Sequence, residues 1–222
     1  MNKISPLATV SPNAKLGDNI EIGPYAYIDD NVEIGDNVTI RECATINRGT
    51  KASGKGVTKV GSNTLIMSYV HIAHDCVVGE HCILVSYVGI AGETEVADWA
   101  IIGGGTKAHQ FSRIGMHAMV GGASRINKDV PPFALCGREP LCYCGVNIVG
   151  LRRRGFSSEV IRNIQDIYNT IYFEGLNITD GCAKVEAGFP PSMERDVILD
   201  FIRGSKRGII RANDSKDHTD FE

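Results

Sequence analysis

One feature constrains the fold of this chain more than any other: an aliphatic residue at every sixth position. The series runs from residue 4 to residue 46, resumes at residue 60 and continues to residue 126. With Ala108 as the exception, its positions hold Ile, Val or Leu, namely Ile4, Val10, Leu16, Ile22, Ile28, Ile34, Ile40, Ile46, Val60, Ile66, Ile72, Val78, Leu84, Ile90, Val96, Ile102, Ile114, Val120 and Ile126. A small or β-branched residue usually follows four positions later, and glycine often follows immediately. Such regularity indicates a repeat architecture.

A period of six fits neither an amphipathic helix nor a half-buried strand, whose periods are about 3.6 and 2. It fits a unit of one short strand and one turn, with the aliphatic side chain pointing inward and Gly or Asn taking the positive φ of the turn. Three units close a triangular coil of about eighteen residues, and coils stack as parallel strands about 4.8 Å apart. The predicted fold class is mainly β, and the hexapeptide pattern resembles the left-handed parallel β-helix.

The repeat also predicts the domain organisation. A Gly- and Lys-rich loop at about 48–59 interrupts the series, and paired prolines end it, so residues 1–132 are predicted to form the β-helix. An irregular exit segment is expected over 133–150, followed by a small C-terminal α-helical domain over 151–211. The polar tail, 212–222, is expected to be disordered.

The C-terminal domain shows helical spacing of apolar residues. A helix is predicted over 160–172, with Ser157 as a suitable N-cap and Gly175 at its end. A second short helix is expected after Thr179, and a third over about 192–203.

Composition narrows the class of protein. The chain has 222 residues, of which 43% are hydrophobic and 22% charged, as in ordinary globular proteins. A net charge of −3 indicates neither a nucleic acid nor an anionic membrane as partner. The N-terminus lacks the apolar run of a signal peptide, and no segment resembles a membrane span. We therefore expect a cytoplasmic protein whose seven cysteines are reduced thiols.

The candidate chemistry centres on the run His-Ile-Ala-His-Asp that contains His74. Both histidines are candidates for proton transfer, and Asp75 is placed to hold an imidazole in one tautomer. One coil beyond His74 the chain has Gly92, and one coil further it has Gln110 beside His109. These residues are expected along one edge of the prism, within about 10 Å. A general base beside a bare backbone N–H suits acyl transfer to a hydroxyl, which needs a proton acceptor and a donor for the oxyanion.

Longer motifs then identify a family. They occur in order along nearly the whole chain, at residues 40–50, 71–76, 109–111, 129–132, 145–156 and 207–211. The most specific is the run Val-Asn-Ile-x-Gly-Leu-x-Arg-Arg-Gly-Phe within 145–156. The sequence resembles the acyl-(acyl-carrier-protein)–UDP-N-acetylglucosamine O-acyltransferases, which begin lipid A biosynthesis. The resemblance implies transfer of a 3-hydroxyacyl chain from acyl carrier protein to the sugar 3-hydroxyl, without metal or cofactor.

The resemblance also implies roles for the residues of the His-rich edge. His74 is the expected general base on the sugar 3-hydroxyl, and Asp75 is expected to orient it. The Gly92 N–H is expected to bind the oxyanion. Three further residues, His71, His109 and Gln110, are expected to line the sugar and acyl pocket.

Other residues are implicated in binding through the same resemblance. Asn147, Arg153 and Arg154 are expected to hold the nucleotide phosphates or the phosphopantetheine arm, often from a neighbouring subunit of a homotrimer. Guanidinium groups suit phosphates, and a basic cluster suits an acidic carrier protein. Gly122 matches the position that limits acyl-chain length, so a long chain is expected, roughly C14 or longer.

The chain departs from the family pattern at three places. Before Ile40, the family has about two further coils and a loop whose Asp and Lys contact the sugar, and this chain has neither. The hexads continue across that join, so the fold should tolerate the loss. Glu93 stands where many members carry histidine, and Val149 replaces a common acid.

Three alternatives remain open from the sequence. His71, His74 and His109 are enough histidines for a γ-carbonic-anhydrase-like zinc site, although their spacing fits that family poorly. An N-acyltransferase of the same pathway shares the hexads but has an N-terminal domain that this chain lacks. The missing coils also allow a non-catalytic or impaired trimeric scaffold.

Overall fold

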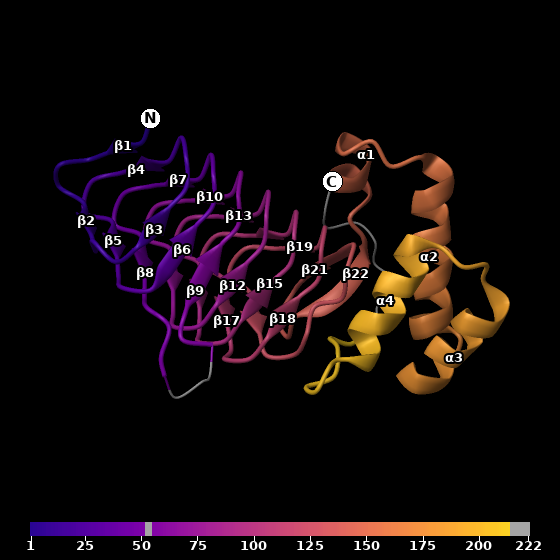
Figure 1. Ribbon diagram of the computed structural model, residues 1–222. Helices are drawn as coiled ribbons and strands as arrows, with labels where there is room; N and C mark the ends of the chain where they lie inside the picture. The colour runs from indigo at the N-terminus through magenta and orange to yellow at the C-terminus, as the bar shows by residue number, and fades with distance from the viewer. Residues whose placement is uncertain (52–54, 214–222) are drawn as a thin grey trace.

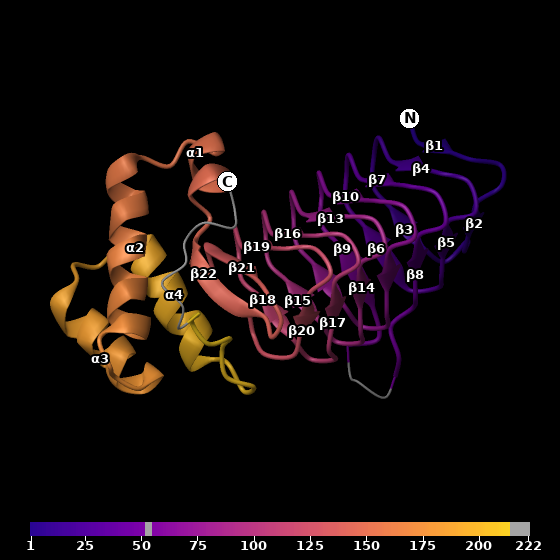
Figure 2. The same ribbon diagram turned by 180° about the vertical axis from the view of Figure 1, so that it is seen from behind.

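The computed structural model describes residues 1–51 and 55–213 of the protein. The chain winds into a column of stacked coils, and helices cover the C-terminal end of the column (Figure 1 and Figure 2). In the described residues the coils contribute strands to three sheets, and neighbouring coils pair in parallel. This is the predicted left-handed parallel β-helix with a C-terminal helical domain.

The strands are short, and successive strands along the chain belong to the three sheets in turn. The last two strands along the chain break this order because both join the first sheet. The first sheet holds β1 (Lys3–Ile4), β4 (Glu21–Ile22), β7 (Thr39–Ile40), β10 (Leu65–Ile66), β13 (Ile83–Leu84), β16 (Ile101–Ile102), β19 (Met119–Val120), β21 (Ala134–Gly137) and β22 (Cys142–Val146). The second holds β2 (Thr9–Val10), β5 (Tyr27–Ile28), β8 (Thr45–Ile46), β11 (His71–Ile72), β14 (Gly89–Ile90), β17 (Lys107–Ala108) and β20 (Arg125–Ile126). The third holds β3 (Lys15–Leu16), β6 (Val32–Ile34), β9 (Thr58–Val60), β12 (Val77–Val78), β15 (Glu95–Val96) and β18 (Arg113–Ile114).

The register follows the predicted coil length. Lys15 pairs with Glu33 in the next coil, 18 residues further on. Where the Gly- and Lys-rich loop intervenes, residues stacked on successive coils are 26 residues apart in the sequence. An example is the pair Asn37 and Asn63, whose side chains hydrogen bond. The loop is therefore extruded from one corner, and the sheets resume their register after it.

The aliphatic residue of each hexad points into the column. Ile40, Ile66 and Leu84 are fully buried, and burying one such side chain contributes roughly 1.5–3 kcal/mol. Ile4 is 43% exposed because the first coil has a neighbour on one side only. The core is thus a continuous stack of aliphatic layers, which explains why the fold tolerates a change in the number of coils.

The glycines that follow the aliphatic residues serve a purpose other than the expected one. A Cβ at Gly61 would lie 2.5 Å from the backbone carbonyl carbon of Gly79 in the next coil. The absent side chain therefore lets successive coils approach each other. The positive φ falls two residues later, at Asn63 (59°) and at the equivalent Trp99 (62°). The expectation of a left-handed turn residue is confirmed for asparagine and is wrong for these glycines.

The ladder continues beyond the paired prolines. β21 pairs in parallel with β19, and β22 then pairs antiparallel to β21. The prediction that the coils stop at 129–132 and that 133–150 is irregular was therefore wrong. The prolines are tolerated because they lie at a corner of the last coil, where the ladder requires no N–H.

Four helices occur in the described C-terminal part: α1 (Ile148–Arg153), α2 (Ser158–Phe173), α3 (Ile178–Gly188) and α4 (Met193–Arg203). Three of them, α2, α3 and α4, were predicted. The Ser157 hydroxyl accepts a hydrogen bond from the Val160 N–H (3.2 Å), as expected of an N-cap, and Gly175 follows α2 with φ 74°. The short helix α1 was not predicted and begins within the expected exit segment.

The described residues also bear on the expected tail and on the domain limits. Ala212 bridges to Tyr143 of β22, and the Asn213 N–H donates to the Tyr143 carbonyl (3.1 Å). These two residues of the tail are therefore ordered, contrary to prediction. Residues 52–54 of the loop and 214–222 of the tail lie outside the described residues. The β-helix therefore extends beyond the expected limit at 132, and the first helix begins before the expected limit at 151. None of the described helices has the length and apolar character needed to cross a membrane.

Candidate functional site

His74 and Asp75 lie at the corner between the second and third sheets, called corner 2–3 below. The Nδ1 atom of His74 is 2.9 Å from Oδ2 of Asp75. The Asp75 side chain is fully buried, whereas that of His74 is 38% exposed. Because the carboxylate accepts the hydrogen bond, the ring proton lies on Nδ1 and Nε2 is left to accept another proton.

Gly92 lies one coil above His74 and makes room for the imidazole. A Cβ at Gly92 would lie 2.3 Å from Nε2 and 2.4 Å from Cε1 of His74, a distance at which atoms clash. The Gly92 N–H has no hydrogen-bond acceptor within residues 1–51 and 55–213. The structure therefore brings the candidate base and the bare N–H together, as the coil spacing predicted.

Asp75 also anchors the extruded loop, a contact that the repeat pattern did not indicate. Its carboxylate accepts hydrogen bonds from the backbone N–H groups of Thr50 (2.9 Å) and Gly56 (2.9 Å) and from the Thr50 hydroxyl (2.9 Å). The Asp75 N–H in turn donates to the Thr58 hydroxyl (2.9 Å). A Gly-rich insertion beside a buried acid was the available signal, because loop N–H groups commonly gather around an anion. The loop thus fixes the carboxylate that orients His74.

His71 lies on the outer face of the second sheet, at the start of β11. Its Nδ1 atom is 2.7 Å from the Thr45 hydroxyl oxygen in the coil below. Burial, together with the nearby ammonium of Lys107, lowers the pKa of His71. The ring is therefore neutral near pH 7.

His109 and Gln110 lie two coils above His74 at corner 2–3. The Nδ1 atom of His109 is 3.1 Å from the Gln110 carbonyl oxygen. Arg207 reaches the same carbonyl from the C-terminal segment, with Nη1 at 3.3 Å. Corner 2–3 therefore carries His74, Gly92 and Gln110 on successive coils, in the predicted order.

Gly122 lies at a different corner, between the first and second sheets (corner 1–2), where it follows β19. It is exposed, and a Cβ there would lie 3.1 Å from the Gly104 carbonyl oxygen. Two coils and three coils below, the same corner carries Tyr87 and Tyr69. Their rings stack with centroids 5.0 Å apart and an interplanar angle of 1°.

Asn147 and Arg154 meet the third corner, between the third and first sheets (corner 3–1). Asn147 caps α1 by accepting a hydrogen bond from the Gly150 N–H (3.1 Å), and its amide donates to the His117 carbonyl (2.9 Å). Nη1 of Arg154 is 3.2 Å from Nδ1 of His117, and its guanidinium carbon lies 5.2 Å from the centroid of the Trp99 ring. Burial, assisted by the charge of Arg154, lowers the pKa of His117 to about 4. His117 is therefore neutral and can accept a hydrogen bond from Arg154.

One chain does not bring all predicted site residues together. Arg153, in the last turn of α1, is exposed. Within one chain the whole width of a sheet separates any two corners. His74, Asp75, Gly92, His109 and Gln110 gather at corner 2–3, whereas Gly122, Asn147, Arg153 and Arg154 belong to the other two corners or to the adjoining helix.

The described residues contain no group of three or more His, Cys, Asp or Glu side chains suited to a metal ion. The thiols of Cys76 and Cys82 pack inside the column, and burial raises the pKa of each to about 12. Each Sγ lies 3.2 Å from a backbone carbonyl of the next coil. These two cysteines are packing groups.

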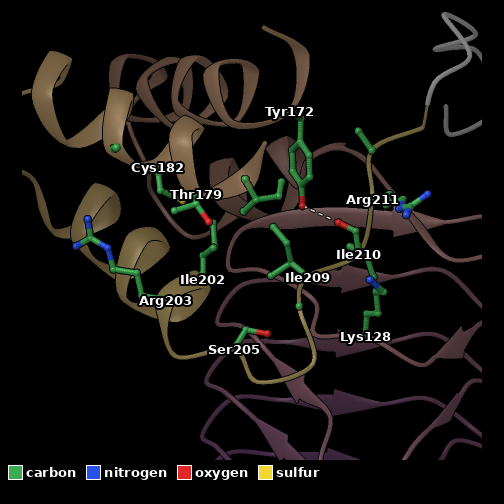
Figure 3. A pocket seen from close by; sticks show the side chains of 14 residues that line it. Lys128, Tyr172, Thr179, Cys182, Ile202, Arg203, Ser205, Ile209, Ile210 and Arg211 are labelled. Atoms are coloured by element: carbon green, nitrogen blue, oxygen red, sulfur yellow. Dashed lines mark hydrogen bonds between the residues drawn. The ribbon is translucent and has the colours of Figure 1, made fainter. Parts of the chain in front are cut away.

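A pocket of about 800 Å³ lies in the helical end of the molecule (Figure 3). It is bordered by Thr179 and Cys182 of α3, by Arg203 of α4 and by the segment 205–212. None of the predicted site residues lines it. The pocket is therefore distinct from the site formed by the residues gathered at corner 2–3.

Comparisons with known proteins agree with this geometry. A family model described as bacterial transferase hexapeptide (six repeats) matches residues 13–48 and 58–92. A second model, described as UDP N-acetylglucosamine O-acyltransferase, domain 2, matches residues 129–210. The acyl-(acyl-carrier-protein)–UDP-N-acetylglucosamine O-acyltransferase of Verminephrobacter eiseniae is 44% identical over 177 residues, which cover 78% of this chain and 67% of the relative. The chain belongs to this family of O-acyltransferases.

Solved structures place the whole fold in the same family. A UDP-N-acetylglucosamine acyltransferase from Bacteroides fragilis superposes with a TM-score of 0.83 at 44% identity, covering 94% of this chain and 100% of that chain. The corresponding enzyme from Francisella novicida gives a TM-score of 0.80 at 32% identity and covers 99% of each chain. The expected fold class and the expected class of enzyme, an acyltransferase, are confirmed.

The curated relatives are longer than this chain. The relative from Thiobacillus denitrificans is 40% identical over 172 residues, which cover 66% of its length. The chain thus spans about two thirds of the curated relatives that it matches. This agrees with the predicted loss of about two coils. At the expected join, β7 pairs directly with β4, matching Ile40 with Ile22, so the ladder closes without a gap.

Proposed function

We propose that this protein transfers a 3-hydroxyacyl chain from acyl carrier protein to the 3-hydroxyl of UDP-N-acetylglucosamine, the first step of lipid A biosynthesis. One observation carries the proposal: the His74 ring is held by Asp75 and seated over the bare backbone of Gly92. The names of the family relatives state the same donor and acceptor.

The proposed mechanism is general-base catalysis. Nε2 of His74 takes the proton of the sugar 3-hydroxyl while the hydroxyl oxygen attacks the thioester carbonyl carbon. The charge that develops on the carbonyl oxygen is stabilised by the Gly92 N–H. The carbon–sulfur bond then breaks, and the proton passes from His74 to the leaving thiolate. Asp75 stabilises the imidazolium between these steps, and the general base contributes about 10²–10⁴-fold.

Neighbouring groups at corner 2–3 supply the walls of the site. His109 and Gln110 stand two coils above His74 at the same corner, and His71 lies on the adjoining face of the second sheet. We assign these three residues to the sugar and acyl pocket. Gly122 is assigned to the end of the acyl channel, where the absence of a side chain leaves room for a long chain.

The active form is proposed to be a cytoplasmic homotrimer with the site between subunits. The support is geometric, because one chain carries Gly122, Arg153 and Arg154 away from its own His74, so another copy has to supply them. The exposed guanidinium of Arg153 suits a phosphate group. Asn147, whose amide is engaged within its own chain, contributes by fixing α1.

A variant without the proposed base tests this assignment. His74→Ala should lower kcat/KM by about 100- to 10,000-fold, because the base is lost and the backbone donor remains. The measurement is turnover of 3-hydroxyacyl carrier proteins of several chain lengths with UDP-N-acetylglucosamine. The control is an unchanged melting temperature and oligomeric state, since the His74 side chain is partly exposed. Activity within a few fold of the parent would rule out His74 as the base.

A further inference from the structure

The outer face of the second sheet, between corners 1–2 and 2–3, carries a cation to which the proposed mechanism gives no role. His71 pairs with Gly89 of the next coil, and Gly89 pairs with Lys107 of the coil above. The Lys107 side chain lies against Gly89. A Cβ on Gly89 would be 3.1 Å from Cδ and 3.3 Å from Nζ of the lysine. The bare glycine thus lets Lys107 fold down across β14, toward His71.

The ammonium of Lys107 is held in place but not neutralised. Its Nζ donates to the Tyr87 carbonyl (2.5 Å). Across the described ranges, no carboxylate forms an ion pair with Lys107. An ammonium group has three N–H donors, so two remain for a ligand. The neighbouring His71 ring is neutral, and one of its nitrogens is already bonded to Thr45.

The position of this cation relative to His74 suits a sugar phosphate. His71, which lies near Lys107, is three residues from His74, and a chain of that length spans at most about 10 Å. In a hexose joined to phosphate at its anomeric carbon, C1, the 3-hydroxyl is attached to a different ring carbon, C3. The phosphate and the 3-hydroxyl are therefore separated by part of the sugar ring. A base and an anion site about one sugar apart would therefore receive both groups of one molecule.

We infer that Lys107, next to His71 of the sugar pocket, binds the diphosphate of the nucleotide-sugar acceptor. This inference rests on the proposed function and names the group that holds the acceptor in a chain without the family's sugar-contacting loop. Lysine binds phosphate oxygens as a compact point charge, with charge-assisted hydrogen bonds.

Two tyrosines indicate that the anion bound by Lys107 is the diphosphate of a nucleotide and not the phosphate of a phosphopantetheine arm. Tyr87, whose carbonyl accepts the hydrogen bond of Lys107, lies at corner 1–2, away from His74 at corner 2–3. Its ring stacks on that of Tyr69, and Tyr69 and Tyr87 are 50% and 58% exposed. A flat aromatic surface beside an anion site suits a nucleoside base, because every base has a face that can stack. A phosphopantetheine arm has no such ring.

The test compares two variants that affect the same ammonium with one matched control. Lys107→Met removes the cation, and Gly89→Ala displaces it, because the new Cβ meets only the flexible end of the lysine. Lys15→Met is the control, because Lys15 is exposed on the third sheet and pairs with Glu33. Calorimetric titration with UDP and with uridine measures the phosphate contribution directly.

Lys107→Met should weaken UDP binding roughly 10- to 100-fold, as expected for a charge-assisted contact. Uridine binding should stay unchanged. The KM for UDP-N-acetylglucosamine should rise by the same factor while kcat stays within a few fold. Gly89→Ala should act in the same direction with a smaller factor, and Lys15→Met should leave both ligands unaffected.

The failures of the inference and of the proposed function are distinguishable. If the parent turns over but Lys107→Met binds UDP within twofold of the parent, the inference alone is overturned. A raised KM for the acyl donor in place of the acceptor would assign Lys107 to the phosphopantetheine arm and would also overturn it. A folded parent that binds no UDP overturns the proposed acceptor and this inference together.

Discussion

The contact between His74 and Gly92 leads to a sharp prediction for Gly92→Ala, a change of one methyl group. The backbone at Gly92 does not adopt a positive φ, so alanine is accepted there without backbone strain. The added Cβ would nevertheless lie 2.3–2.9 Å from three atoms of the His74 ring. The ring has to swing out toward solvent, which breaks the hydrogen bond to Asp75 (2.9 Å).

The expected magnitudes differ for activity and for stability. Loss of the positioned base should lower kcat/KM by about 100- to 10,000-fold, as for removal of the imidazole itself. The free energy of unfolding should fall by about 1 kcal/mol or less, because the partly exposed ring can move without opening the core. For a chain of this size that corresponds to a drop in Tm of about 2–4 °C at most.

Steady-state kinetics and thermal melting of Gly92→Ala, His74→Ala and the double variant test this reasoning. If the new methyl group acts only through the imidazole, it has nothing to displace in the His74→Ala background. The double variant should then be as inactive as His74→Ala and no less stable. Activity of Gly92→Ala within a few fold of the parent would show that the ring does not need its place over Gly92. A further large loss in the double variant would show that the methyl group acts on the oxyanion donor instead.

Two further predictions concern the other corners. Gly122→Met should shift the preference of the enzyme toward shorter acyl donors, because a bulky side chain fills the end of the proposed channel; an unchanged preference for chains of roughly C14 or longer across a series of acyl carrier proteins would refute that placement. His117 should make the protein less stable in acid, because burial and Arg154 lower its pKa from 6.5 to about 4. The unfolded chain takes up this proton at higher pH than the folded chain does, so the stability present above pH 6.5 is lost as the pH falls toward 4. The free energy of unfolding should fall by about 2 kcal/mol between pH 7 and pH 5. Denaturant titrations of the parent and of His117→Gln at both pH values should therefore diverge, and parallel curves would contradict the assignment.

The predictions from sequence succeeded where the repeat converts distance along the chain into position in space. The spacing of 18 residues places Gly92 above His74 and Gln110 above Gly92. The N-cap at Ser157 was equally visible, because capping depends on one side chain and a backbone N–H three residues away. Prediction failed at the prolines of 129–132, because their sequence pattern does not reveal that they occupy a corner of the last coil.

The site itself was predicted only in part. The orienting role of Asp75 was expected, but its hydrogen bonds to Thr50 and Gly56 were not, because the path of the folded loop decides which backbone N–H groups reach the carboxylate. The folding of Lys107 onto Gly89 depends on a rotamer that a pattern of residue types does not specify. Such contacts combine residues from different coils whose identities are not periodic.

The sequence by itself determined that this chain forms a β-helix and that His74, Gly92 and Gln110 share an edge. A hexapeptide repeat imposes the same local geometry on every coil, so the period alone sets which residues stack. Only the tertiary structure decided that Arg154 meets another corner than His74 in one chain, and that the extruded loop encloses Asp75. The physical reason is that these arrangements depend on how non-repeating segments pack against the column, and packing is selected by the whole fold rather than by any local pattern.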